Sequence, residues 1–156
     1  LITARIIGQD LIYAGAESWT SWVAINQYSI KEDGFDYSDA TLTATDNYEE
    51  WYVAERYYGF AHFSKYIPVN STCLDNGFFP DENNDFNVFS FLTPESKTVT
   101  VIVNEGKEKE ITLDSDFGKM EVIESTQEYK LKTIYNGEYK NTLTVKENSI
   151  LTVINE

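Results

Sequence analysis

The chain has 156 residues, of which 42% are hydrophobic, and its formal net charge at pH 7 is −14. Its length suits one ordinary domain, and the negative charge argues against binding to nucleic-acid phosphates or adsorption to anionic membranes. Because the sequence contains no run of about 18 apolar residues, we expect no transmembrane span. Cys73 is the only cysteine, so the chain cannot form an internal disulfide.

The first 26 residues predict a helix followed by a buried strand. Apolar side chains three or four positions apart favour a helix over residues 2–14, which Gly15 is expected to end in a left-handed conformation. Residues 16–26 carry no charge after Glu17 and are rich in β-branched and aromatic side chains. This composition is typical of a strand buried on both faces of a parallel sheet.

A long loop and a second helix are predicted next. Residues 27–46 are polar, with Gly34 and five acidic residues, and are interpreted as a loop that follows the strand. Residues 47–66 place apolar side chains on one helical stripe, and Pro68 prevents the helix from continuing. The stripe consists of Trp51, Ala54, Tyr58 and Ala61.

Residues 1–66 are therefore expected to contain two half-buried helices and a single buried strand. One strand cannot form a sheet, so this part of the sequence indicates the end of a larger structure. We expect residues 1–66 to expose apolar faces, which favours aggregation, oligomerisation or local mobility. A start at Leu1 rather than Met is compatible with a processed product or a fragment.

From residue 70 onward the hydrophobic pattern changes to the period of two that is typical of strands. Short strands separated by regular turns indicate an antiparallel β-sandwich. Residues 104–107 are expected to form a hairpin connection, and Asn136-Gly137 a turn. The predicted strands are residues 86–92, 99–103, 110–113, 120–124, 128–135, 142–145 and 150–154.

Residues 62–68, which read His-Phe-Ser-Lys-Tyr-Ile-Pro, resemble a stretch near the end of the (β/α)8 barrel in glycoside hydrolase family 30. The resemblance covers nearly the whole chain, although Ala61 and Asn70-Ser71 depart from the family's usual residues. Further similarities lie in the preceding helix, the eighth barrel strand and two sandwich strands, at residues 10–11, 19–22, 99–104 and 149–152.

The resemblance implies an α+β composite fold. Residues 1–66 would be the last helix–strand–helix of a (β/α)8 barrel, and residues 67–156 would be a C-terminal antiparallel β-sandwich. Members of the family hydrolyse β-linked glycosides with retention, using one glutamate on the fourth barrel strand and one on the seventh. Both positions would lie upstream of Leu1.

The resemblance thus implies the C-terminal portion of a retaining β-glycoside hydrolase, inactive on its own, whose complete barrel binds a carbohydrate substrate. It implies no cofactor, and an extracellular or cell-envelope location for the parent protein. Glucosyl, xylosyl, fucosyl and 1,6-linked galactosyl or glucosyl substrates are all compatible with it. Two alternatives stay open: a non-catalytic carbohydrate-binding module and a purely structural β-sandwich.

Trp22 is the main candidate for binding substrate. It lies near the carboxyl end of the predicted strand, where barrel active sites form, and a flat indole suits the C–H face of a sugar. In the family, the corresponding tryptophan lines the catalytic subsite. Asn26, Gln27 and Tyr28 follow the strand and are weaker candidates for contacts with sugar hydroxyls. A core position is the alternative for Trp22, whereas Trp19 is expected in the core.

No residue of this chain is expected to be catalytic or to bind a metal. Glu17 lies at the amino end of the predicted strand, and the three aspartates of residues 33–39 are expected to be solvated. His62, the only histidine, is expected to be structural, at the joint between barrel and sandwich. The acidic cluster of residues 75–85 lacks the spacing and glycine of an EF-hand, so calcium binding is a secondary hypothesis.

Overall fold

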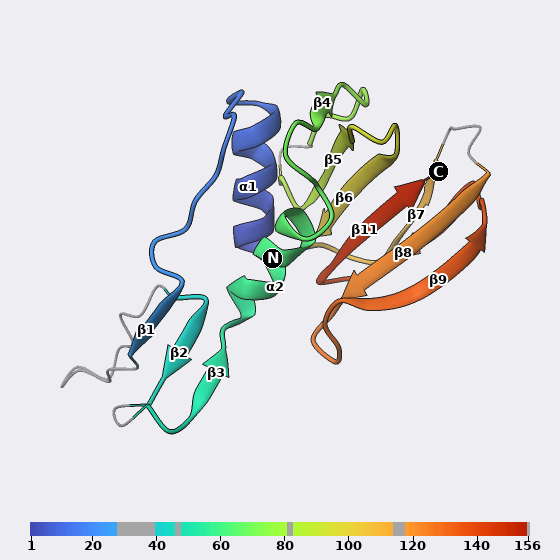
Figure 1. Cartoon of the computed structure of the whole chain (residues 1–156). Helices are drawn as coiled ribbons and strands as arrows, with labels where there is room; N and C mark the ends of the chain where they lie inside the picture. The colour runs from blue at the N-terminus through green and yellow to red at the C-terminus, as the bar shows by residue number, and fades with distance from the viewer. Residues whose placement is uncertain (28–39, 46–47, 81–82, 114–117, 156) are drawn as a thin grey trace.

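The structure, a computed structural model, describes residues 1–27, 40–45, 48–80, 83–113 and 118–155. It consists mostly of β-sheet, with two helices (Figure 1). The helices are α1 (Ile2–Ile12) and α2 (Glu55–Ser64). The strands are β1 (Ile25–Gln27), β2 (Leu42–Ala44), β3 (Trp51–Val53), β4 (Thr72–Leu74), β5 (Phe86–Leu92), β6 (Thr98–Asn104), β7 (Lys109–Thr112), β8 (Lys119–Ser125), β9 (Lys132–Glu138), β10 (Thr142–Val145) and β11 (Ser149–Asn155).

A six-stranded antiparallel sheet in the order β4-β5-β6-β11-β8-β9 forms the centre of the molecule. Its inner strands β6 and β11 are apolar on both faces, because Val, Ile and Leu occupy successive positions that point to opposite sides. In β6, Val101 and Val103 face the helices, while Ile102 faces the other side. The sheet therefore buries both faces, with a separate hydrophobic core on each.

The first core lies between this sheet and the two helices (Figure 1). It joins Ile7 of α1 and Phe63 of α2 to Phe89 and Phe91 of β5. Gly8 allows α1 to approach the sheet closely, because a Cβ at that position would lie 2.2 Å from the ring of Phe89. The helices and the sheet thus share one core, and the predicted division into domains at residue 66 stays a prediction.

The second core lies between the sheet and a small layer in which β7 pairs with β10. Ile111 and Leu143 from this layer pack against a cluster that includes Val122 and Leu151 of the large sheet. Two sheets of unequal size thus form the β-sandwich that the alternating pattern predicted. The boundaries of β5 and β10 are those expected from the sequence.

Residues 104–107 do not form the predicted hairpin, because β6 and β7 belong to different sheets. Asn104 is fully buried, and its amide nitrogen donates to the carbonyl oxygens of Lys107 and Lys146, each at 2.8 Å. The backbone N–H of Gly106 donates to Asn104 Oδ1 at 3.1 Å. These bonds lead the chain across the sandwich instead of back along β6.

The predicted turn at Asn136-Gly137 is also wrong, because both residues lie within β9, opposite Glu121 and Met120 of β8. The glycine has a packing role there. A Cβ on Gly137 would lie 3.1 Å from the hydroxyl oxygen of Tyr135, whose side chain folds along the strand. Glycine at position 137 therefore leaves room for the side chain of Tyr135 and does not mark a turn.

The first helix is close to its prediction. It ends at Ile12 rather than at residue 14, and Gly15 adopts the predicted left-handed conformation, with φ of 67°. The N–H of Ala16 then donates to the carbonyl oxygen of Asp10 at 2.9 Å, which satisfies a carbonyl at the helix end.

The strand predicted over residues 16–26 is wrong. Only β1 forms, at residues 25–27; it pairs in parallel with β2 over three residues, and Ile25 is 50% exposed. A strand buried on both faces belongs inside a larger parallel sheet, with neighbours on both sides. The described residues supply β1 with one neighbour, so it is a short and exposed edge strand.

The predicted loop and second helix also need correction. Residues 28–39 of the loop lie outside the described residues, but residues 42–44 form β2. Residues 51–53 form β3, antiparallel to β2, so α2 begins at Glu55 rather than at residue 47. Three consecutive strand-forming side chains, Trp-Tyr-Val, outweigh the helical stripe here. Trp51 of that stripe is half exposed, whereas Ala61 is buried on α2 as expected.

Candidate functional site

Trp22 is open to solvent in this structure. Its side chain is 87% exposed, in the extended segment between α1 and β1, and its peptide bond to Val23 is cis. A cavity of about 480 Å³ is lined by its neighbours Ser21 and Ala24, together with residues of α2, but not by Trp22 itself. Trp22 is therefore not part of a core formed by the described residues, and its role in binding stays a prediction.

The weaker candidates lie on β1 or beyond it. Asn26 is exposed and lies opposite Thr43 of β2. Gln27 is the last residue of β1 and pairs with Ala44, while Tyr28 lies outside the described residues. Trp22 and Asn26 share one extended segment, but neither lines any of the three cavities described here.

Trp19 packs against the helical core, as predicted. Its indole N–H donates to Asp10 Oδ2 at 2.9 Å, and its ring centroid lies 5.8 Å from that of Phe60 on α2. These contacts attach the segment after α1 to both helices. Of two tryptophans three positions apart, one is therefore anchored and the other is exposed.

His62 joins helix α2 to two strands of the large sheet, and its side chain is fully buried. Its Nδ1 lies 2.7 Å from the hydroxyl oxygen of Thr152 on β11, and its Nε2 lies 2.8 Å from the hydroxyl oxygen of Ser125 on β8. Burial lowers the pKa of His62 to about 3, so the ring is neutral near pH 7. With both nitrogens bonded internally, the histidine has the structural role that the sequence predicted.

The hydrogen bonds around His62 favour one tautomer. Ser125 Oγ accepts the N–H of Leu131 at 2.8 Å, which leaves its own proton to donate to Nε2. Thr152 Oγ1 directs its proton to the carbonyl oxygen of His62 at 3.4 Å, so it accepts the proton on Nδ1. The arrangement uses every donor once and places the ring proton on Nδ1.

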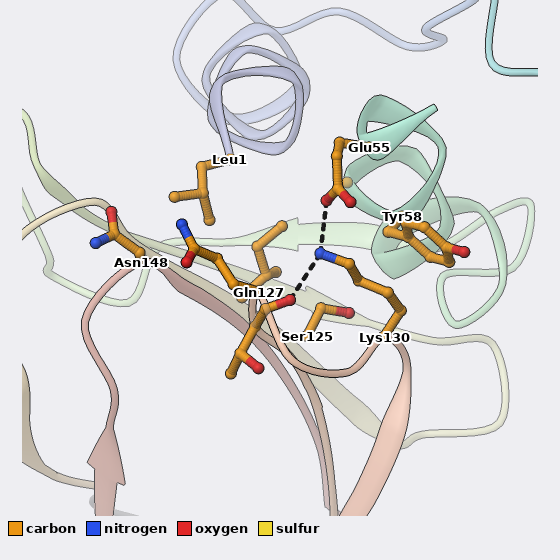
Figure 2. Close-up of a pocket in the computed structure, with 10 residues that line it drawn as sticks. Leu1, Glu55, Tyr58, Ser125, Gln127, Lys130 and Asn148 are labelled. Carbon is orange, nitrogen blue, oxygen red and sulfur yellow. Dashed lines mark hydrogen bonds and ion pairs between the residues drawn. The ribbon is translucent and has the colours of Figure 1, made fainter. Parts of the chain in front are cut away.

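A polar cavity of about 390 Å³ lies between α2 and the connection from β8 to β9 (Figure 2). Lys130 Nζ lies at its wall, 2.5 Å from Glu55 Oε2 and 2.7 Å from the carbonyl oxygen of Thr126. The ammonium is also 5.6 Å from the centre of the Tyr58 ring. This ion pair links residues 75 positions apart, and no local pattern in the sequence predicts it.

A third, more apolar cavity of about 860 Å³ lies between α1, α2 and β4 and includes Leu11, Trp19 and Cys73 in its lining. The lining of this third cavity contains one carboxylate, Glu17. The cavity beside Lys130 also contains one, Glu55, and the cavity beside Ser21 contains none. Hydrolysis of a glycosidic bond generally requires two carboxyl groups about 5 to 10 Å apart. These three cavities do not supply such a pair.

Glu124 is a buried carboxylate that the sequence pattern did not reveal. One of its oxygens accepts the hydroxyl of Tyr129 and lies 3.3 Å from Lys146 Nζ, which is itself 2.7 Å from Tyr129 Oη. Burial, together with the hydrogen bond to Glu124, raises the pKa of Tyr129. The cluster ties β8 to the turn between β10 and β11, so its role is structural.

Asp75 and Asp85 of the acidic cluster serve local structure, whereas Asp81 and Glu82 lie outside the described residues. Asp75 Oδ1 accepts the N–H of Gly77 at 2.9 Å, and Asp85 Oδ1 lies 3.8 Å from Lys109 Nζ. Within the described part of the chain, no three His, Cys, Asp or Glu side chains are grouped so that they can hold a metal ion. In the same residues, no helix is long and apolar enough to cross a membrane.

Comparison with known proteins gives one family. Residues 77–153 match the family model described as the glycosyl hydrolase family 30 beta sandwich domain. This range contains β5 to β10 and most of β11, that is, the sandwich without its edge strand β4. No curated protein matches the chain.

Solved structures share the fold beyond the sandwich. The catalytic domain of GH30 xylanase C from Talaromyces cellulolyticus matches with a TM-score of 0.80 and 16% identity, over 99% of this chain and 34% of its own length. A conserved exported protein from Bacteroides fragilis matches with a TM-score of 0.78 and 22% identity, over 99% of this chain and 33% of its own. A GH30 endoxylanase from Clostridium papyrosolvens matches with a TM-score of 0.56 and 18% identity, over 67% and 28%. This chain thus spans about a third or less of these proteins.

Proposed function

The chain belongs to glycosyl hydrolase family 30 through its β-sandwich domain, and on this premise we propose that it is the C-terminal portion of a retaining β-glycoside hydrolase. In this proposal, residues 1–66 are the last helix–strand–helix of a (β/α)8 barrel, and both catalytic glutamates lie upstream of Leu1. The supporting observation is that 99% of the chain matches about a third of a family 30 catalytic domain.

The positions of exposed apolar side chains support the proposal. Among the described residues, fourteen large apolar side chains are exposed, and ten of these lie in residues 1–66. They include Ile2 on α1, Ile25 on β1 and Val53 on β3. Water contact with so many apolar groups in one region is typical of a surface that is covered in the complete protein. The rest of a barrel would cover part of this surface, including these three side chains.

The sandwich has a mechanical role in this proposal. Because α1 and α2 share a core with the six-stranded sheet, the sheet holds the last two barrel helices at a defined distance from each other. His62 adds two buried hydrogen bonds from α2 to β8 and β11. A catalytic barrel needs its strands placed within fractions of an ångström, and a rigid support at its closing helix provides this.

The test uses the natural polypeptide that contains residues 1–156, incubated with 4-nitrophenyl β-glycosides of glucose, xylose, fucose and galactose. We expect hydrolysis of at least one of them, with the β-anomer formed first when the product is followed by proton NMR. Residues 1–156 alone should release no 4-nitrophenol, since the cavities described here lack a carboxylate pair. Inversion, or turnover by residues 1–156 alone, would contradict the proposal.

A further inference from the structure

Two aromatic side chains lie close together where β2 turns into β3. Two backbone hydrogen bonds close the turn. The N–H of Tyr48 donates to the carbonyl oxygen of Thr45 at 2.9 Å, and the N–H of Thr45 donates to the carbonyl oxygen of Glu50 at 3.0 Å. The ring centroids of Tyr48 and Trp51 are 6.3 Å apart, inclined at 48°. Tyr48 is 57% exposed and Trp51 is 52% exposed, so about half of each residue is open to solvent.

The register of the small sheet places this turn. β1 and β2 are parallel, with Ile25 opposite Leu42 and Gln27 opposite Ala44, so the chain leaves both strands at the same edge. The turn before β3 therefore lies beyond the carboxyl end of β1. In a (β/α)8 barrel, the substrate binds at the carboxyl ends of the strands. Figure 1 shows the β1–β2–β3 sheet extending away from the six-stranded sheet, so the sandwich does not cover this turn.

The chemistry of the turn selects one class of ligand. Flat aromatic rings stack against the C–H faces of sugars. Glu49 and Glu50 lie between the two aromatic residues, and the chain as a whole has a net charge of −14. Acidic polysaccharides would be repelled, whereas an uncharged saccharide would not.

We propose that Tyr48 and Trp51 form an aromatic platform that binds an uncharged β-linked oligosaccharide chain at a distance from the catalytic subsite. This inference rests on the function proposed above, because the platform extends the substrate-binding surface at the mouth of the barrel. It gives the protein a preference for long substrates over short ones. Tyr52 serves as a comparison, since alternate residues of a strand point to opposite faces, and its hydroxyl donates to Glu50 at 2.7 Å.

The experiment compares the natural polypeptide with its Tyr48→Ala/Trp51→Ala double variant and with Tyr52→Ala as the matched control. The probes are xylohexaose, a β-1,6-linked glucohexaose and the 4-nitrophenyl β-glycosides of the same sugars. The readout is the ratio of kcat/KM for the hexasaccharide to kcat/KM for the aryl glycoside. For two lost stacking contacts, we expect this ratio to fall about tenfold in the double variant and to stay within about twofold in Tyr52→Ala.

An unchanged ratio in the double variant overturns the platform, as does an equal fall in Tyr52→Ala. A loss on both probes together with a lower melting temperature also overturns it, because it shows that the rings are covered by protein. If the natural polypeptide hydrolyses no probe, the proposed hydrolase function fails separately. The platform is then decided by calorimetric titration with the two hexasaccharides, where wild-type affinity in the double variant rejects it and weaker binding supports it.

Discussion

Trp22 and His62 show how burial separates a candidate binding residue from a structural one. The indole of Trp22 is almost completely exposed, so the fold gains little from it. The imidazole of His62 is fully buried, and both of its nitrogens are bonded to hydroxyls of the sheet. Substitutions at these two positions should therefore affect different properties of the protein.

Replacement of Trp22 by alanine should reduce catalysis without reducing stability. In the natural polypeptide, we expect kcat/KM for its preferred aryl β-glycoside to fall at least about tenfold, as expected for a lost sugar-stacking contact at the catalytic subsite. The melting temperature of residues 1–156 should change little, because surface substitutions usually alter the free energy of unfolding by less than about 0.5 kcal/mol. Trp19→Ala is the matched comparison, and it should lower the melting temperature because Trp19 is bonded to Asp10.

His62 should stay neutral well below its ordinary range. Since it is the only histidine, its ring signals in nitrogen-correlated NMR spectra are assigned without ambiguity. Burial lowers its pKa from 6.5 to about 3, so we expect no titration between pH 5 and pH 8, and a proton on Nδ1. A midpoint near 6.5, or a proton on Nε2, would contradict the hydrogen-bond arrangement described above.

The same shift makes stability depend on pH. Between the unfolded pKa of 6.5 and the folded value of about 3, the unfolded chain binds one more proton at this residue than the folded chain. The stabilisation is therefore complete above about pH 6.5 and is lost as the pH falls, by at most about 1.4 kcal/mol per pH unit. Urea unfolding of residues 1–156 at pH 7 and pH 5 should show a smaller loss in His62→Gln than in wild type.

Among the helices and strands, the sandwich strands were predictable and the elements of residues 16–66 were not. β5 and β10 have local patterns that match their environments: the apolar run of β5 is buried on both faces, and β10 alternates between exposed and more buried positions. The formation of β1 and β3, in contrast, depends on their pairing with β2. The pattern of residues 16–26 indicates a strand buried on both faces, but the described residues supply β1 with a single partner over three residues.

The connections between strands were also hard to predict when they depend on residues far away in the sequence. Asn104 begins a connection that the sequence identified, but its side chain leads the chain to the other sheet through bonds to Lys107 and to Lys146, a residue 42 positions away. No local pattern encodes such a partner. The candidate site shows the same limit. The role of Trp22 stays a prediction, and the pairing of Tyr48 with Trp51 depends on a hairpin whose sequence pattern indicated a helix.

Asn104 should be essential for joining the two sheets. In Asn104→Ala, the carbonyl oxygens of Lys107 and Lys146 lose their donor, so we expect the free energy of unfolding to fall by about 1 to 3 kcal/mol. Asn104→Asp should cost more, because it places a negative charge against the same carbonyl oxygens. Asn136→Ala, at an exposed position of β9, is the control and should change little. Equal stability of the Ala and Asp variants in urea titrations would reject this role.

In the molecule as a whole, the sandwich and the N-terminal part differ in how well their apolar side chains are buried. Both faces of the six-stranded sheet are covered, by helices on one side and by the β7–β10 layer on the other. The β1–β2–β3 sheet is exposed, and apart from the proposed platform of Tyr48 and Trp51 it holds three of the exposed large apolar side chains, Ile25, Tyr52 and Val53. This contrast agrees with the function proposed above.

Residues 1–156 on their own should therefore self-associate. We expect sedimentation velocity to show oligomers whose proportion rises with protein concentration, because ten large apolar side chains among the described part of residues 1–66 are exposed. The Ile2→Ser/Ile25→Ser double variant should shift the population towards the monomer. A strictly monomeric wild-type chain with one cooperative melting transition would show that this surface needs no partner.

The most direct measurement is the intact mass of the protein as its native source produces it. If the chain is the C-terminal portion of a hydrolase, the mass should be roughly three times the 17.9 kDa of these residues, since the chain covers 34% of the matched xylanase domain. That result would place room for the catalytic strands upstream of Leu1. A mass of 17.9 kDa would contradict the proposed function, because the protein would then lack the rest of the barrel.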